Sequence, residues 1–181
     1  INMITTEHFL DRPYRIPNIE ETKDLQAFID YHEAKLLRAM FGTTLYNLFV
    51  AGIGAATPEQ KWVDLRDGKV YSYNSTNYNF PGLIEVLKAY IYAKWLKENE
   101  DKVTNSGVMR NTVDKSEHVG GWERYVAAYN VFSSMAGNID RQENTFYGFM
   151  YANWEDYVTN LSDWIFCYPH NDPEFENQLG I

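Results

Sequence analysis

Residues 81–100, PGLIEVLKAYIYAKWLKENE, decide the fold of this chain. Pro81 and Gly82 precede a run in which apolar side chains recur every three or four residues, which predicts an α-helix with an apolar face. The members of that face are Leu83, Val86, Leu87, Tyr90, Ile91 and Trp95. A helix over residues 82–100 would be about 28 Å long, so it can run the length of a small domain.

The region upstream of this stretch repeats the helical spacing. Asn18, followed by acidic residues, is typical of a helix start, and the apolar period continues to Phe41. Gly42 is expected to end this first helix, and a short second helix is expected to start directly after it.

Two further elements are expected before Pro81. Pro58 at a first helical position predicts a short helix that ends near Gly68. Residues 69–80 combine strand-forming residues with the turn-forming run Asn74–Asn77, which favours a small β-hairpin or an irregular loop.

The region downstream begins with a segment that has no helical period. Residues 101–120 are expected to form a long loop or an extended hairpin, and segments of this length are usually functional or disordered. From Gly121 the period returns and continues towards Pro169. A single helix over residues 119–151 would be about 50 Å long, too long for a compact monomer, and Gly137 is a plausible kink.

Length and composition indicate one folded domain. The chain has 181 residues, 45% of them hydrophobic and 16% aromatic, and a chain of this size buries roughly 70% of its unfolded surface. The prediction is a mainly α protein, a helical bundle with long helices. It divides into an N-terminal arm (1–17), a single helical domain (18–168) and a C-terminal tail (169–181).

Charge and hydropathy restrict the partners. The net charge is −9, and residues 121–181 contain nine acidic and two basic side chains. An acidic surface repels phosphate, so specific binding to DNA or to an anionic membrane is not expected. The uncharged stretch Thr43–Ala56 is too short to cross a bilayer, and we expect neither a membrane protein nor a secretory precursor.

No residue pattern supports catalysis or metal binding, so no catalytic residue, metal ligand or cofactor is predicted. His32-Glu33 lacks the second histidine of a zincin helix and is expected to be a polar flank of the first helix. Asp114 and His118 lack a third ligand, and Cys167 with His170 lacks an orienting group. Gly120-Gly121 lacks the strand and lysine of a phosphate loop.

Aromatic residues are dense near the C-terminus. Nine of the 23 residues from Phe146 to Tyr168 are aromatic, which is more than one helix can easily bury. Some of these rings are therefore expected to contact another subunit.

The order of several short motifs resembles that of the head-to-tail connector (adaptor, ring) proteins of tailed phages, nearest to those of crAss-like and related phages of Bacteroidota. The resemblance covers roughly residues 18–152. Its motifs are Leu25–Ile29, Leu36–Tyr46, Asp67–Tyr71, Pro81–Leu83, Ala89–Leu96, Thr104–Val108 and Ala127–Asn130.

The resemblance implies a structural virion protein and not an enzyme. Such subunits form a homo-oligomeric ring, of twelve copies, beneath the portal protein and against a neighbouring tail or ring protein. DNA passes through the channel without specific binding. The expected location is the head-to-tail interface of the virion, after assembly in the host cytoplasm.

Two regions are expected to make the contacts between subunits or rings, namely the loop over 101–120 and the aromatic C-terminal region. The candidate interface residues are Thr104, Asn105, Val108, Met109, Arg110, Trp154, Tyr157, Trp164, Phe166 and Tyr168. Two alternatives remain open. One is an acidic all-helical enzyme that acts on sugars or another small ligand, with a deep pocket of convergent carboxylates. The other is a protein interaction module that uses the same aromatic residues.

Overall fold

The computed structural model describes residues 2–16, 24–104, 107–110, 121–137 and 143–154. The chain is mainly α-helical, as predicted, with two small antiparallel hairpins in the described part. In chain order the elements are the 3-10 turn η1 (Thr6–Phe9), α1 (Leu25–Ile53), α2 (Gln60–Asp67), β1 (Lys69–Tyr73), β2 (Thr76–Phe80), α3 (Leu83–Glu100), β3 (Asp101–Thr104), β4 (Gly107–Arg110), α4 (Gly121–Ala136) and α5 (Phe146–Asn153).

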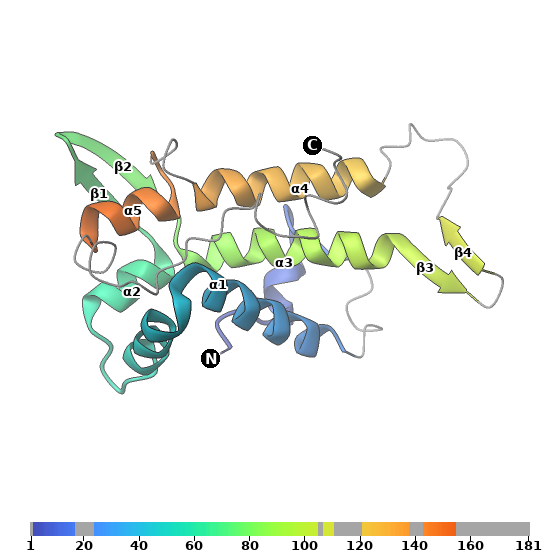
Figure 1. The fold of residues 1–181 in the computed structure, drawn as a ribbon, viewed down its shortest axis with the longest axis horizontal. Coiled ribbons are helices and arrows are strands. Elements are labelled where there is room, and N and C mark those ends of the chain that lie inside the picture. Colours follow the sequence, from blue (N-terminus) through green and yellow to red (C-terminus); the bar gives the residue numbers. More distant parts are fainter. Residues whose placement is uncertain (1, 17–23, 105–106, 111–120, 138–142, 155–181) are drawn as a thin grey trace.

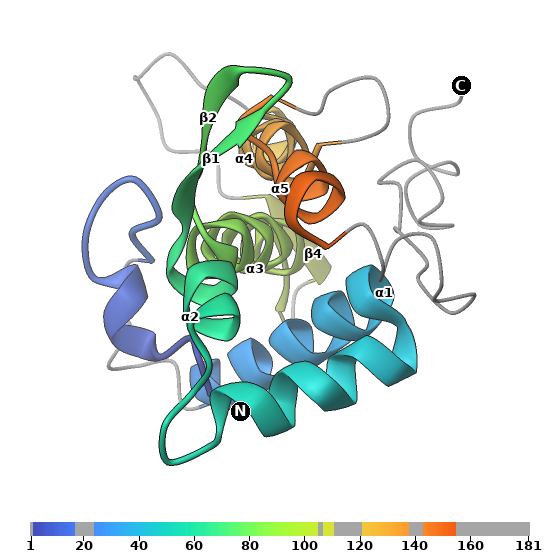
Figure 2. The same ribbon diagram turned by 90° about the vertical axis from the view of Figure 1, so that its left-hand side faces the viewer.

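Helix α3 is the central element, and its bounds agree with the prediction from residues 82–100. Figure 1 shows α3 along the long axis of the molecule, with antiparallel α4 on one side and α1 on the other, and Figure 2 shows the same arrangement end on. Five members of the predicted apolar face are buried and Trp95 is half-buried, and Ala89, Ala93 and Lys94, outside that face, are buried as well. Burial therefore extends beyond the predicted apolar face, as expected for a helix that is covered on more than one side.

Helix α1 bends at Gly42, as predicted. Gly42 has φ 67° and ψ 176°, a non-helical conformation that separates residues 25–41 from residues 43–53. This combination of a positive φ with an extended ψ is open essentially only to glycine. The predicted start at Asn18 lies outside the described residues, and α1 begins at Leu25.

By length and composition, α1 is the one helix in the described ranges that could cross a membrane. The break at Gly42 divides it into two arms, each shorter than the roughly 20 residues that a straight span needs. Its side chains Ile29, Leu37 and Phe41 are buried in the protein core. In the 18-residue window that meets this test, 33% of the residues are buried.

The segment between α2 and α3 is a hairpin, as one of the two alternatives for residues 69–80 predicts. β1 and β2 pair with Lys69 opposite Phe80 and Tyr73 opposite Thr76. The two-residue turn, Asn74 and Ser75, has positive φ at both positions, which matches the right-handed twist of the strands.

The part of the chain after residue 120 differs from the prediction of one long helix. α4 ends at Ala136, and Gly137 has φ 73°, the conformation that commonly ends a helix. α5 is a separate short helix that starts after Thr145, whose hydroxyl accepts a hydrogen bond from the Gly148 amide. The expectation of a helix too long for a compact monomer is therefore wrong.

The N-terminal arm is packed into the core. Ile4, Phe9, Tyr14 and Ile16 are all buried. The arm is not extended throughout, because residues 6–9 form the turn η1 and the Ile16 amide donates to the Phe9 carbonyl. Through these four side chains the N-terminal arm joins the same hydrophobic core as the helices.

Candidate functional site

The β3–β4 hairpin is the part of the described chain that stands apart from the helical body. α3 ends at Glu100 and β3 begins at Asp101, so no loop separates them. Figure 1 shows the hairpin beyond the ends of α1 and α4. Its extensive contacts are between its own two strands and with the end of α3.

Four of the predicted interface residues lie on this hairpin. Thr104 ends β3 and pairs with Gly107, while Val108, Met109 and Arg110 follow on β4. Asn105 lies outside the described residues. The predicted contact region and the projecting hairpin therefore coincide along the backbone.

Trp154 does not lie where an interface residue should. Its side chain is only 5% exposed, and its ring centroid is 5.0 Å from that of Trp62 on α2. The prediction that Trp154 contacts another subunit or subunit ring is corrected, because its side chain is already buried within its own chain. Tyr157, Trp164, Phe166 and Tyr168 lie outside the described residues.

The aromatic residues of α5 pack inside the protein against the β1–β2 hairpin. Phe149 stacks on Phe80 with ring centroids 4.7 Å apart and meets Tyr71 edge-on. Burial, together with the charges of Tyr78 and Glu143, raises the pKa of Tyr71 to about 12. For residues 146–154, aromatic density reflects core packing and not exposed surface.

His32 and Glu33 are buried in the core and do not form the polar flank expected from the sequence. The His32 ring is 4% exposed, lies among the rings of Phe28, Tyr31 and Tyr90, and places Nε2 3.3 Å from Oε1 of Glu98. This is a packed helix contact and not a zinc site of the zincin kind.

Glu33 holds the N-terminal arm. Its carboxylate accepts hydrogen bonds from the backbone amides of Met3 (3.2 Å) and Ile4 (3.0 Å). Burial raises the pKa of Glu33, although these two hydrogen bonds act in the opposite direction. The sequence contains the signal, because Glu33 falls four residues after Ile29 and three before Leu36, on the apolar face.

Gln26, two helical turns before Glu33 on α1, also binds the N-terminal arm. Its Oε1 accepts from the Thr6 amide and its Nε2 donates to the Ile4 carbonyl. The two side chains of α1 thereby satisfy backbone groups that would otherwise need a neighbouring strand.

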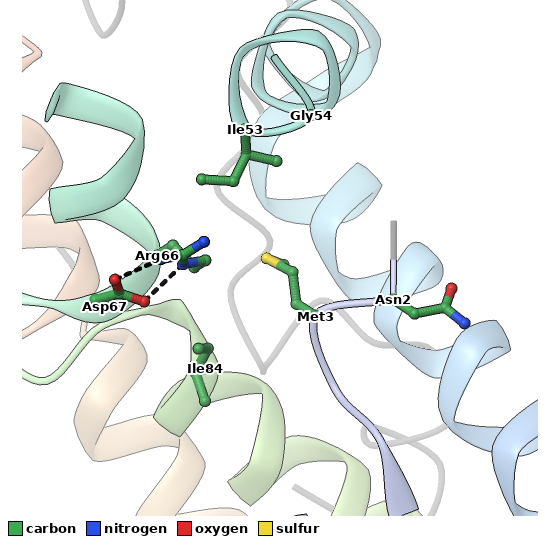
Figure 3. Close-up of a pocket in the computed structure, with 7 residues that line it drawn as sticks. All are labelled: Asn2, Met3, Ile53, Gly54, Arg66, Asp67 and Ile84. Carbon is green, nitrogen blue, oxygen red and sulfur yellow. Dashed lines mark hydrogen bonds and ion pairs between the residues drawn. The ribbon is translucent and has the colours of Figure 1, made fainter. Parts of the chain in front are cut away.

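A pocket of about 380 Å³ opens between the N-terminal arm and α2 (Figure 3). It is lined by Asn2, Met3, Ile53, Gly54, Arg66, Asp67 and Ile84. The Arg66 guanidinium donates from Nε and Nη2 to the two Asp67 oxygens, each at 2.6 Å. This hydrogen bonding lowers the pKa of Asp67, so its carboxylate is poorly suited to act as a base.

Among the described residues that line the pocket, Asp67 has no second acid beside it. Its lining includes one carboxylate and no histidine, cysteine or serine. Convergent carboxylates with shifted pKa values, which a sugar-cleaving enzyme needs, are not found among these seven residues.

Metal-binding residues do not converge in the part of the chain that the structure describes, where no three His, Cys, Asp or Glu side chains form a group that could hold an ion. Asp114, His118, Cys167 and His170 lie outside the described residues. No protein-family model, curated protein or solved structure matches the chain.

Proposed function

We propose that this chain is a structural subunit of a ring that joins the portal to the tail of a tailed phage and continues the DNA channel. The observation that carries the proposal is the β3–β4 hairpin at the end of the central helix. It adds to the resemblance of residues 18–152 to head-to-tail connector proteins.

The hairpin is built as a contact element. Two strands of four residues are marginally stable in water by themselves. Each strand has one edge that the described residues leave without a paired strand, and such edges are templates for pairing with another chain. A neighbouring subunit would supply the missing surface.

A closed ring uses this kind of asymmetric contact. Each subunit presents a projecting element on one side and a different receiving surface on the other, so that the contact repeats until the ring closes. The proposed partners are further copies of this chain, twelve in the ring, together with the portal protein and a neighbouring tail or ring protein.

The charge of the chain is compatible with a DNA channel. A net charge of −9 repels the phosphate backbone, so DNA can move past without a long-lived contact. The competing proposal of a sugar-processing enzyme lacks support from the pocket of Figure 3, whose single carboxylate is already engaged by Arg66.

Electron microscopy of the full chain tests the proposal. The protein is imaged alone at high concentration and after mixing with the portal protein of the same genome, with closed rings expected in at least the second sample. A monomer in both samples would contradict the proposal.

A hairpin variant makes the test specific. Residues 101–110 are replaced by a short Gly-Ser linker, which is expected to abolish rings while the helical content by circular dichroism and the melting temperature stay close to those of the parent. The fold should survive, because the main contact of the hairpin with a described helix is the one with α3. Rings that persist without the hairpin would show that it is not the contact element.

A further inference from the structure

The outward side of α1 carries a basic and aromatic surface that the proposed function does not yet use. Tyr31, Lys35 and Arg38 are exposed at a spacing of four and three residues, so they lie on one side of the helix. Half-buried Tyr46 joins them across the bend at Gly42. We name these four residues the α1 outer face.

The two cations of the α1 outer face lie over tyrosine rings. Lys35 Nζ is 6.0 Å from the ring centroid of Tyr31, and Arg38 Cζ is 5.1 Å from that of Tyr46. The Tyr31 side chain is 61% exposed. The surface therefore offers flat aromatic area and positive charge side by side.

No acid of the described residues neutralises these cations. Ion pairs join Lys61, Lys69, Lys88 and Arg66 to acidic partners, whereas none in the described part of the chain involves Lys35 or Arg38. Residues 34–58 contain no Asp or Glu at all.

Two acids on α1 and α3 have other partners. Asp30 accepts a hydrogen bond from Gln26, and Glu98 lies against His32. In a chain of net charge −9, two exposed cations without an acidic partner favour an acidic ligand.

The chain itself contains a segment of matching chemistry. Residues 155–181 include six acidic side chains and no lysine or arginine. The first part, residues 155–168, also holds Tyr157, Trp164, Phe166 and Tyr168. Carboxylates can pair with Lys35 and Arg38, and aromatic rings can stack on Arg38 and on the two tyrosines.

The point at which this segment leaves the body is fixed. Trp154 is held against Trp62 on α2, so everything after it starts from the α2 end of the molecule. A segment of 14 residues can reach at most about 45–50 Å, which is enough to extend to a neighbouring molecule.

We infer that the α1 outer face binds residues 155–168 of a second copy of this chain. The inference rests on the proposed ring, in which each subunit needs two different surfaces that match. The acidic aromatic segment of one copy and the basic aromatic face of the next are such a pair.

Carbodiimide cross-linking of the full chain tests the inference. This reagent joins an amine to a nearby carboxylate without a spacer, so a bond between Lys35 and Glu155, Asp156 or Asp163 would locate the contact. Equal amounts of ¹⁴N-labelled and ¹⁵N-labelled protein are mixed, alone and with the portal protein, and cross-linked peptides are identified by mass spectrometry.

The isotope pattern identifies the copies involved. Mixed-isotope peptides containing Lys35 and residues 155–163 are expected. Peptides of one isotope alone would overturn the inference, because the segment would then bind its own copy. The absence of Lys35 cross-links would overturn it as well, and rings seen without these cross-links would leave the proposed function intact.

Charge reversal provides the matched variant. K35E/R38E is expected to weaken association between copies by about tenfold or more, since two attractive pairs become repulsive, and D156K/D163K in the same chain is expected to restore part of it. K61E, which reverses an exposed lysine on α2 that pairs with Glu59, is the control and should have little effect. Unchanged association in K35E/R38E would overturn the inference.

Discussion

Trp62 and Trp154 lie with their ring centroids 5.0 Å apart, and this contact fastens the end of α5 to α2. Both rings are almost fully buried, at 4% and 5% exposure. The contact brings together residues that are far apart in the sequence, and it fixes where the C-terminal segment begins.

Replacement of Trp154 by alanine is expected to lower the free energy of unfolding by about 3–5 kcal/mol, because a large buried ring is lost and a cavity remains. Trp154→Phe should lose less. Urea denaturation measures the change, with Leu48→Ala at an exposed position (43%) as control. If Trp154→Ala kept normal stability but no longer assembled into subunit rings, Trp154 would instead have an interface role.

Glu33 should make stability depend on pH in a defined direction. Burial raises the pKa of its carboxyl above the ordinary value of 4.5, so the folded chain holds this proton more tightly than the unfolded chain. The contribution of Glu33 to stability therefore rises as the pH falls through the raised pKa towards 4.5, and it levels off below that value.

Glu33→Gln removes this titration, and the variant should lack that gain on acidification. Gln also offers only one acceptor oxygen to the amides of Met3 and Ile4, so hydrogen exchange at one of these amides should be faster. Urea denaturation over a pH series gives the comparison, with Glu59→Gln controlling for the loss of an exposed carboxylate. Equal pH profiles for the parent and Glu33→Gln would refute the assignment.

Tyr71 should destabilise the fold at alkaline pH. Its pKa is about 12 in the folded chain, compared with 10.0 for an ordinary tyrosine. As the pH rises from 10 to 12 the unfolded chain loses this proton first, so stability falls in that window. Tyr71→Phe should show a shallower decline, measured by denaturation at each pH, whereas Tyr73→Phe on the same strand is the control.

Gly82 should tolerate no side chain. It has φ 96°, and a Cβ atom there would lie 2.5 Å from the carbonyl carbon of Asp67, while a Cβ on Gly68 would lie 2.5 Å from the Phe80 oxygen. Gly82→Ala is expected to cost about 2 kcal/mol or more. Gly54→Ala is the milder comparison, because its φ is −81° and the added Cβ would lie 3.0 Å from the Val50 carbonyl oxygen. Similar melting temperatures for the two variants would contradict this account.

Local patterns in the sequence predicted most of the helices because each has a signal within a few residues. The period over 82–100 gives α3, and Gly42 and Gly68 mark the break in α1 and the end of α2. The prediction of one helix over residues 119–151 was wrong. The apolar spacing continues, but α4 ends at Ala136, before the positive φ of Gly137, and α5 begins only at Phe146 after the Thr145 cap.

The candidate site was less predictable, because exposure depends on tertiary packing. Tryptophan is a residue type that is common at interfaces, but the partner of Trp154 is Trp62, on a helix far away in the sequence. No local sequence pattern links the two residues. Glu33 could be found from its place on the apolar face, whereas the amides of Met3 and Ile4 that it binds could not.

The direct passage from Glu100 to Asp101 has a mechanical consequence. Because no loop residue lies between the two elements, the direction of the hairpin follows from the last turn of the helix at the centre of the bundle. Loosening of that helix anywhere along its length would misplace the tip. Substitutions deep in the interior could therefore disrupt assembly while leaving every contact surface chemically unchanged.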